Sequence, residues 1–164
     1  MPDDSKTIVT NTTPLIALTA ATGSLDVLRE LYAHVVVPYE VAAEIRAGGN
    51  SAFGLDVFEK ASWLDIRQSP VVLPPYLQSS LDRGEAGVIQ TALQEGIELV
   101  CIDEVAGRRV ARLSQLRLTG SIGILLKARS MGFNISIPEA LSRMRAHGVW
   151  LSDRVVRFAL EQSQ

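Results

Sequence analysis

Short β-prone runs alternate with helix-like segments along this chain, and the alternation constrains its fold more than any other feature. The clearest run, residues 99–102, is apolar throughout, as expected for a parallel strand that is buried on both faces. Further runs at residues 7–10, 35–37, 63–66 and 116–118 predict four more strands. Because helical segments separate these strands, the sequence predicts an α/β fold in which helices cover both faces of a parallel sheet.

Prolines, glycines and apolar spacing predict where the helices lie. Pro38 opens one helix, in which Val37, Val41 and Ile45 are spaced by four and share one face. The other helices are predicted at residues 15–21, from 24 or 26 to 31, at 53–61, 82–95 and 105–113, near 120–132, and at 138–146 and 152–160. Residues 69–75 predict a proline-containing loop.

Length and composition limit the class of protein. A chain of 164 residues suggests one domain, and 47% hydrophobic residues are enough for a sizeable core. The lone cysteine, Cys101, excludes an internal disulfide framework. No apolar run reaches the roughly 18 residues needed to span a membrane, and the N-terminal segment lacks a signal-peptide pattern. We therefore expect a cytoplasmic protein that does not bind membranes.

Charge is distributed unevenly, although the net charge is only −2. Residues 1–82 carry 5 basic and 10 acidic side chains, whereas residues 83–157 carry 11 basic and 7 acidic ones. Of the 16 basic residues, 13 are arginines, whose planar guanidinium suits phosphate oxygens better than the ammonium of lysine. The basic segment predicts either contacts with phosphate or a solvated face with ion pairs, and the net charge does not favour tight nonspecific binding to duplexes.

Oxygen-bearing side chains gather just after the predicted strands. Asn11 follows the first strand, and Asp103 and Glu104 follow the fourth. Glu85 opens the long helix that precedes the fourth strand, and Glu44 lies on the helix after the second. Because ligand sites of parallel sheets form at the carboxyl ends of strands, we expect these side chains to converge on one edge. Carboxylates this close repel one another unless a cation neutralises them, and Mg²⁺ or Mn²⁺ prefers oxygen ligands.

Each of these residues also has a structural explanation. Asn11 and Asp103 suit helix caps, because a short polar side chain accepts a hydrogen bond from an exposed backbone N–H. Glu85 suits the first turn of a helix, where the helix dipole favours negative charge. Glu44, one turn after Glu40, fits a solvated helix face. Their combination, rather than any one of them, favours a metal site.

Other kinds of catalytic or binding site have little support in the sequence. His34 and His147 lie far apart, and neither has a second ligand at metal-binding spacing. No Walker loop and no glycine-rich dinucleotide fingerprint follows the first strand. Cys101 and the two histidines form no convincing catalytic triad.

Four segments of the chain resemble the acidic motifs of PIN domains. They are Ile8-Val9-Thr10-Asn11-Thr12-Thr13-Pro14-Leu15-Ile16, Val37-Pro38-x-x-Val41-x-x-Glu44-Ile45, Gly84-Glu85-Ala86, and Cys101-Ile102-Asp103-Glu104 followed by Gly107-Arg108-Arg109. Two later segments, residues 119–125 and 148–152, resemble a PIN-like subgroup of poorly defined function in bacteria and archaea. The resemblance runs from about residue 7 to residue 160, and the order and spacing of the motifs make it fairly specific.

The resemblance implies a three-layer α/β/α sandwich with a central parallel sheet of about five strands. It also implies an endoribonuclease that depends on Mg²⁺ or Mn²⁺ and has RNA as its substrate. Many members of the family are toxins of toxin–antitoxin pairs, and dimers are common among them. On this basis we expect a small antitoxin protein as a partner and a homodimer as the assembly.

The functional residues that the resemblance implies fall into three groups. The catalytic residues, which also hold the metal, are Asn11, Glu44, Glu85 and Asp103, with Glu104 as an additional ligand. Thr12 or Thr13 positions a metal-bound water, and Arg83, Arg108 and Arg109 bind the nucleic acid.

Asn11 departs from the family pattern, which usually has aspartate at this position. An asparagine still offers a carbonyl oxygen to a metal but brings no charge, so metal affinity should fall. One hypothesis is therefore an active ribonuclease, and a second is a catalytically weakened module that binds nucleic acid or a partner. A third is an unrelated Rossmann-like domain in which these residues are only helix caps.

Overall fold

The computed structural model describes residues 6–48 and 52–164 of the chain. Its strands are β1 (Thr7–Thr10), β2 (His34–Val37), β3 (Asp65–Ile66), β4 (Leu99–Cys101) and β5 (Arg117–Thr119). They form one five-stranded sheet in the order β3-β2-β1-β4-β5, and every pair of neighbours is parallel. The predicted strands are thus confirmed, with bounds that shift by at most two residues.

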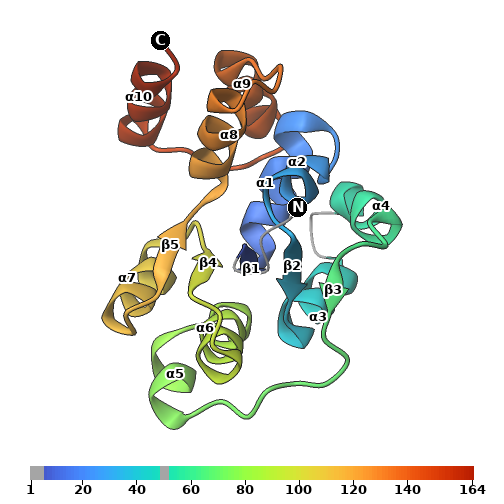
Figure 1. Cartoon of the computed structure of the whole chain (residues 1–164), viewed down its shortest axis with the longest axis vertical. Helices are drawn as coiled ribbons and strands as arrows, with labels where there is room; N and C mark the ends of the chain where they lie inside the picture. The colour runs from blue at the N-terminus through green and yellow to red at the C-terminus, as the bar shows by residue number, and fades with distance from the viewer. Residues whose placement is uncertain (1–5, 49–51) are drawn as a thin grey trace.

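Helices connect successive strands and continue after the last one (Figure 1). They are α1 (Thr12–Thr22), α2 (Asp26–Leu31), α3 (Tyr39–Ala47), α4 (Ala52–Lys60), α5 (Pro75–Ser80), α6 (Arg83–Glu95), α7 (Val105–Leu113), α8 (Ser121–Ser130), α9 (Ile137–Ala146) and α10 (Asp153–Gln162). In the described part of the chain, none of them is long and apolar enough to cross a membrane.

Two groups of helices pack around the sheet. Helix α1 contacts α4, α8 and α9, and α2 contacts α8, so these helices form one layer. Helix α6 lies against β1 and β4, with α5 and α7 beside it, and belongs to the other layer (Figure 1). Helix α3 contacts both α1 and α6. The arrangement confirms the predicted α/β/α sandwich with a central parallel sheet.

Aliphatic side chains supply most of the core, as the low aromatic content requires. Ile8 and Val9 of β1 and Val100 of β4 are fully buried in the middle of the sheet. The two central strands are thus buried on both faces, which explains the continuous apolar sequence of β4.

Successive strands are added first on one side of β1 and then on the other. From β1 the chain proceeds through β2 to the edge strand β3, and it then returns past β1 to form β4 and β5. The carboxyl ends of β1 and β4 therefore lie at a topological switch point, where loops diverge and leave room for a ligand. Asn11 follows one of these strand ends, and Ile102-Asp103-Glu104 follows the other.

Helix α5 was not predicted, because the sequence favoured a proline-containing loop up to residue 75. The helix begins at Pro75, whose fixed φ suits the first helical position. Only Leu77 of its six residues is buried, so the segment shows no apolar periodicity from which a helix could be recognised.

Candidate metal centre

Asn11 occupies the position before helix α1 but does not act as its cap. Its side chain makes no capping hydrogen bond, whereas its backbone N–H donates to the carbonyl of Cys101 at 3.0 Å and joins the ends of β1 and β4. The residue is only 2% exposed, and its Oδ1 atom has no hydrogen-bond partner. A buried carbonyl oxygen without a partner is costly, so this atom needs a ligand.

Glu85 lies in the first turn of α6 and is also buried. It is 6% exposed, and its Oε2 atom has no hydrogen-bond partner. A Cβ atom on Gly107 of α7 would lie 2.6 Å from this oxygen, so glycine at that position lets the carboxylate approach α7. Burial first, and then the neighbouring carboxyls of Asp82 and Glu104, raise the pKa of Glu85 from 4.5 to about 9.

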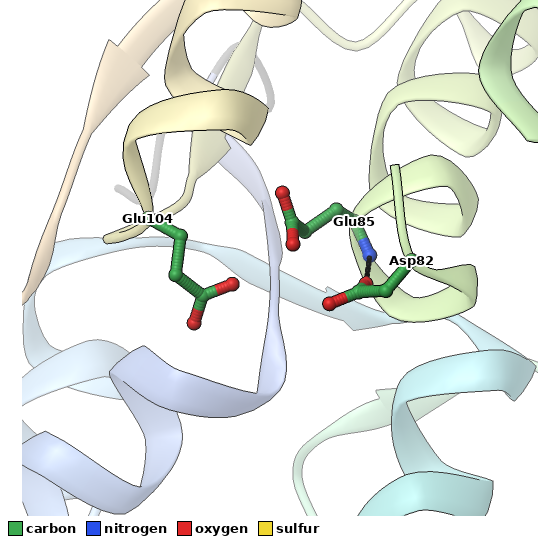
Figure 2. Close-up of side chains that lie close together, drawn as sticks. All are labelled: Asp82, Glu85 and Glu104. Atoms are coloured by element: carbon green, nitrogen blue, oxygen red, sulfur yellow. Dashed lines mark hydrogen bonds between the residues drawn. The ribbon is translucent and has the colours of Figure 1, made fainter. Parts of the chain in front are cut away.

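The carboxylates of Asp82, Glu85 and Glu104 form one cluster. One oxygen atom from each residue can be chosen so that all three lie within 4.8 Å of one another. Figure 2 shows the carboxylates of Asp82, just before α6, and of Glu85, in its first turn, near that of Glu104, which comes from the loop between β4 and α7. The dashed line in that view is the hydrogen bond of 2.8 Å by which the Glu85 backbone N–H donates to Asp82 Oδ1.

Gly84 brings two further oxygen atoms to the edge of this cluster. A Cβ atom at this position would lie 2.8 Å from Glu44 Oε2, 3.0 Å from Asn11 Oδ1 and 3.6 Å from Asp82 Oδ1. Glycine therefore lets α6 approach β1 and α3 closely enough for these oxygens to surround its first turn. Thr12 fixes the orientation of Glu44, since its hydroxyl donates to Glu44 Oε2 at 2.8 Å.

Thr13 fixes the orientation of Glu104 in the same way. The Thr13 hydroxyl donates a hydrogen bond to Glu104 Oε1, although the two residues come from different segments of the chain. Glu104 stands before the first residue of α7 but makes no capping hydrogen bond, so its carboxylate remains directed at the cluster. The two threonines therefore orient two carboxylates by hydrogen bonds.

Asp103 is held on the other side of the same loop. Its Oδ1 accepts from the backbone N–H of Ser121 at 2.7 Å, and its Oδ2 accepts from the Ser121 hydroxyl at 2.9 Å. Burial raises the pKa of Asp103, and the two bonds from Ser121 oppose that rise. Among the described residues, Asp103 is not part of the cluster formed by Asp82, Glu85 and Glu104.

Arg108 lies beside Asp103 and is directed inward. Its Nη1 donates to the carbonyl of Ile102 at 2.8 Å. A Cβ atom on Gly120 would meet both Asp103 Oδ1, at 2.6 Å, and Arg108 Nη1, at 2.9 Å. Burial lowers the pKa of Arg108. This guanidinium supports the loop after β4, and it is less exposed than Arg109, its neighbour on α7.

A groove of about 590 Å³ runs beside the cluster between α3 and α6. Its lining consists of Tyr39, Glu40, Ala43, Glu44, Pro70, Asp82, Arg83 and Gly84. Arg83 is exposed and is the cationic residue of that lining. The groove opens Glu44 and the Asp82 carboxylate of the cluster to solvent.

Sequence reasoning did not include Asp82 among the functional residues. The predicted helix began at residue 82, so Asp82 was treated as part of its first turn. It is instead the N-cap of α6, and its carboxylate lies beside that of Glu85. The available signal was the spacing of three between Asp82 and Glu85, because N-cap and N3 side chains meet at one helix terminus.

The residues present fit a divalent cation of the hard, oxygen-preferring kind. The donor set consists of carboxylate and amide oxygens, and two of these atoms are buried without a partner. A cation bound among the carboxylates would relieve the repulsion among them.

Comparison with known proteins supports this description. A family model described as a PIN domain matches residues 7–164. Neither the curated proteins nor the solved structures that were searched gave a match. PIN domains generally depend on divalent metals, in agreement with the acidic cluster at the carboxyl ends of the strands. Since the family model covers nearly the whole chain, this protein belongs to the PIN domain family.

Proposed function

We propose that this chain is an endoribonuclease of PIN type that depends on Mg²⁺ or Mn²⁺. The observation that carries the proposal is the pair of buried oxygen atoms without partners, Asn11 Oδ1 and Glu85 Oε2, at the edge of a carboxylate cluster. Buried polar atoms are rarely left without a partner, and a cation bound at this cluster would supply one.

The residues that hold the cation in this proposal are Asn11, Glu85 and Glu104, with Glu44 at the edge of the site. A bound divalent cation supplies a water of lowered pKa and polarises the phosphodiester. Thr12 and Thr13 orient Glu44 and Glu104 through their hydrogen bonds.

The arginines have different roles in this proposal. Arg83 on the lining of the groove and the exposed Arg109 bind phosphates of the RNA strand. Arg108 and Asp103 fix the loop that carries Glu104, since both are held by internal hydrogen bonds.

Membership of the PIN family suggests a biological setting as well. In this proposal the chain acts in the cytoplasm as a homodimer and as the toxin of a toxin–antitoxin pair, and a small antitoxin protein inhibits it. Co-purification of a small protein expressed from a neighbouring gene tests the pairing, and the mass of the purified protein in solution tests the dimer.

An RNA cleavage assay tests the activity. Purified protein should cut single-stranded or structured RNA in the presence of Mn²⁺ or Mg²⁺ and should stop when EDTA is added. Glu85→Gln should reduce the rate by about a hundredfold or more, since the variant loses a charged metal ligand at the buried end of the site. Asp26→Asn, a matched loss of one carboxylate at the exposed start of α2, should cut RNA at the natural rate. RNA cleavage that persists both in EDTA and in the Glu85→Gln variant would contradict the proposal.

A second candidate function is a binding module that retains the fold without efficient catalysis. The uncharged Asn11 favours it, because aspartate at this position would bring a further negative charge to the cation. Asn11→Asp separates the two functions. If the variant cuts RNA and the natural protein does not, the chain is a binding module; if both cut at comparable rates, it is an enzyme.

A further inference from the structure

Asp82 has a place in the site that the PIN motifs do not explain. It lies outside the Gly84-Glu85-Ala86 motif and precedes α6 as its N-cap. The capping bond from the Glu85 N–H accounts for one oxygen of its carboxylate. Capping also brings Asp82 close to Glu85, but it does not account for the approach of this carboxylate to Glu104, which comes from the loop after β4: ligand atoms of the three residues lie within 4.8 Å of one another.

The neighbourhood of Gly84 relates Asp82 to Asn11. Oxygen atoms of both residues lie around the open side of this glycine, 3.6 and 3.0 Å from the position that a Cβ would occupy. Asp82 approaches from the N-terminus of α6, and Asn11 approaches from the end of β1. The two side chains therefore approach the first turn of α6 at Gly84 from different elements.

The charges of these two residues are complementary. Asn11 offers an oxygen without charge, and Asp82 adds a carboxylate beside it. Asn11 Oδ1 beside Asp82 and Glu85 Oε2 in the carboxylate cluster are both buried and lack hydrogen-bond partners, which a cation could supply and helix capping does not. Without a cation, a third carboxylate here would only add repulsion.

We propose that Asp82 is a metal ligand of this protein and that it supplies, from the cap of α6, the negative charge that Asn11 does not bring. This inference rests on the proposed metal-dependent function and adds a residue to its site. It also explains how the chain retains a cation site with asparagine after β1.

Asparagine at position 82 separates the two roles of Asp82. Asparagine caps helices as well as aspartate does, so Asp82→Asn removes the charge and keeps the cap. Asp82→Ser is a second variant of the same kind. Both should melt within about 3 °C of the natural protein in EDTA, because the hydrogen bond to the Glu85 N–H is retained.

Calorimetric titration with Mn²⁺ alone is the test. Asp82→Asn should raise the dissociation constant about tenfold or more, because charge count in the ligand set controls the affinity of such sites. Adding Asn11→Asp to Asp82→Asn should return the constant to within about threefold of the natural value. Asp26→Asn removes a carboxylate from a helix terminus outside the site and should leave the constant unchanged.

Two results would overturn the inference. Natural affinity in Asp82→Asn would mean that the residue is only a cap. Equal weakening in Asp82→Asn and Asp26→Asn would mean that net charge, not ligation, controls binding. The proposed ribonuclease activity is tested by a different measurement. If Asp82→Asn loses Mn²⁺ affinity while neither the natural protein nor any variant cuts RNA, Asp82 is a metal ligand and the ribonuclease proposal is wrong.

Discussion

Gly84 controls how closely oxygen atoms can gather at the start of α6. An added Cβ would lie 2.8 Å from Glu44 Oε2 and 3.0 Å from Asn11 Oδ1. Both atoms are the ends of side chains, which can rotate away without disturbing the backbone. Gly84→Ala should therefore keep the fold, and the gain in helix propensity of up to about 1 kcal/mol offsets the contact. Its Mn²⁺ dissociation constant should rise about tenfold, because Asn11 and Glu44 are displaced.

Gly87, one turn later on α6, provides the matched control. Its added Cβ would lie 2.9 Å from Glu40 Oε1 and 3.2 Å from Glu40 Cβ, outside the carboxylate cluster. Gly87→Ala should lower the melting temperature and leave Mn²⁺ affinity unchanged. Equal Mn²⁺ affinity in Gly84→Ala and the natural protein would show that the oxygens around Gly84 do not bind the ion.

Glu85 makes the stability of the metal-free protein depend on pH. The folded protein keeps this proton to about pH 9, whereas the unfolded chain releases it near 4.5. Between these values the folded state binds more protons, so the free energy of unfolding falls as pH rises. The contribution is complete below pH 4.5 and is lost by about pH 9.

Glu85→Gln should remove most of this pH dependence, because glutamine does not titrate. In EDTA at pH 8 the variant should be more stable than the natural protein by on the order of 1–3 kcal/mol, since glutamine needs no proton from solvent when the site becomes buried on folding. Melting curves from pH 5 to 9 measure the effect. A natural protein whose melting temperature rises across this range, with Glu85→Gln following it in parallel, would show that Glu85 is not the group responsible.

Individual residues show where sequence reasoning succeeded and where it did not. Asn11, Glu85 and Glu104 are predicted from their places after strands or at a helix start; the structure puts Glu85 and Glu104 in one cluster and Asn11 beside Gly84 at its edge, while their role as metal ligands stays a prediction. Asp103 was ranked before its neighbour Glu104, but the turn of the chain aims Asp103 at Ser121. Successive residues in an extended loop point in opposite directions, and the register of that loop is set by packing that the sequence does not display.

At the scale of elements, Asp103 links the end of β4 to the start of α8. It accepts hydrogen bonds from both the backbone N–H and the hydroxyl of Ser121, which is 2% exposed. Its negative charge also lies at the helix terminus where the macrodipole stabilises it.

Ser121→Ala should therefore lower the stability of the whole domain without removing the metal site. The loss should be about 1–2 kcal/mol, the value of one buried hydrogen bond to a charged group, and Mn²⁺ affinity should stay within about threefold. Melting curves and calorimetric titration of the same sample provide both readings. A large loss of Mn²⁺ affinity with unchanged stability would indicate instead that Asp103 is itself a ligand oriented by Ser121.

The elements themselves were largely predictable, and the exceptions have physical reasons. Long helices such as α6 and the apolar strand β4 carry clear periodicity or continuous hydrophobicity. The edge strand β3 has only two residues and few buried atoms, so its bounds follow from pairing with β2 rather than from its composition. Helix α5 has a single buried residue and therefore no apolar pattern.

At the scale of the molecule, the order of the strands creates the site. Placing β1 between β2 and β4 brings the ends of two sequence-distant segments together, with α6 crossing the same edge. The sequence predicted this convergence because α/β topology follows from the alternation of elements. Membership of the PIN family excludes the third hypothesis, an unrelated domain with similar caps. The place of Asp82 in the cluster and its distances to Glu85 and Glu104 required the structure, since they depend on how close α6 and α7 pack.

Diffraction at the manganese absorption edge, from crystals of the natural protein soaked in Mn²⁺, tests the central claim directly. We predict an anomalous peak bounded by the carboxylates of Asp82, Glu85 and Glu104 and by the amide oxygen of Asn11. A peak bound elsewhere on the chain, or no peak in this cluster at Mn²⁺ concentrations that support cleavage, would contradict the claim.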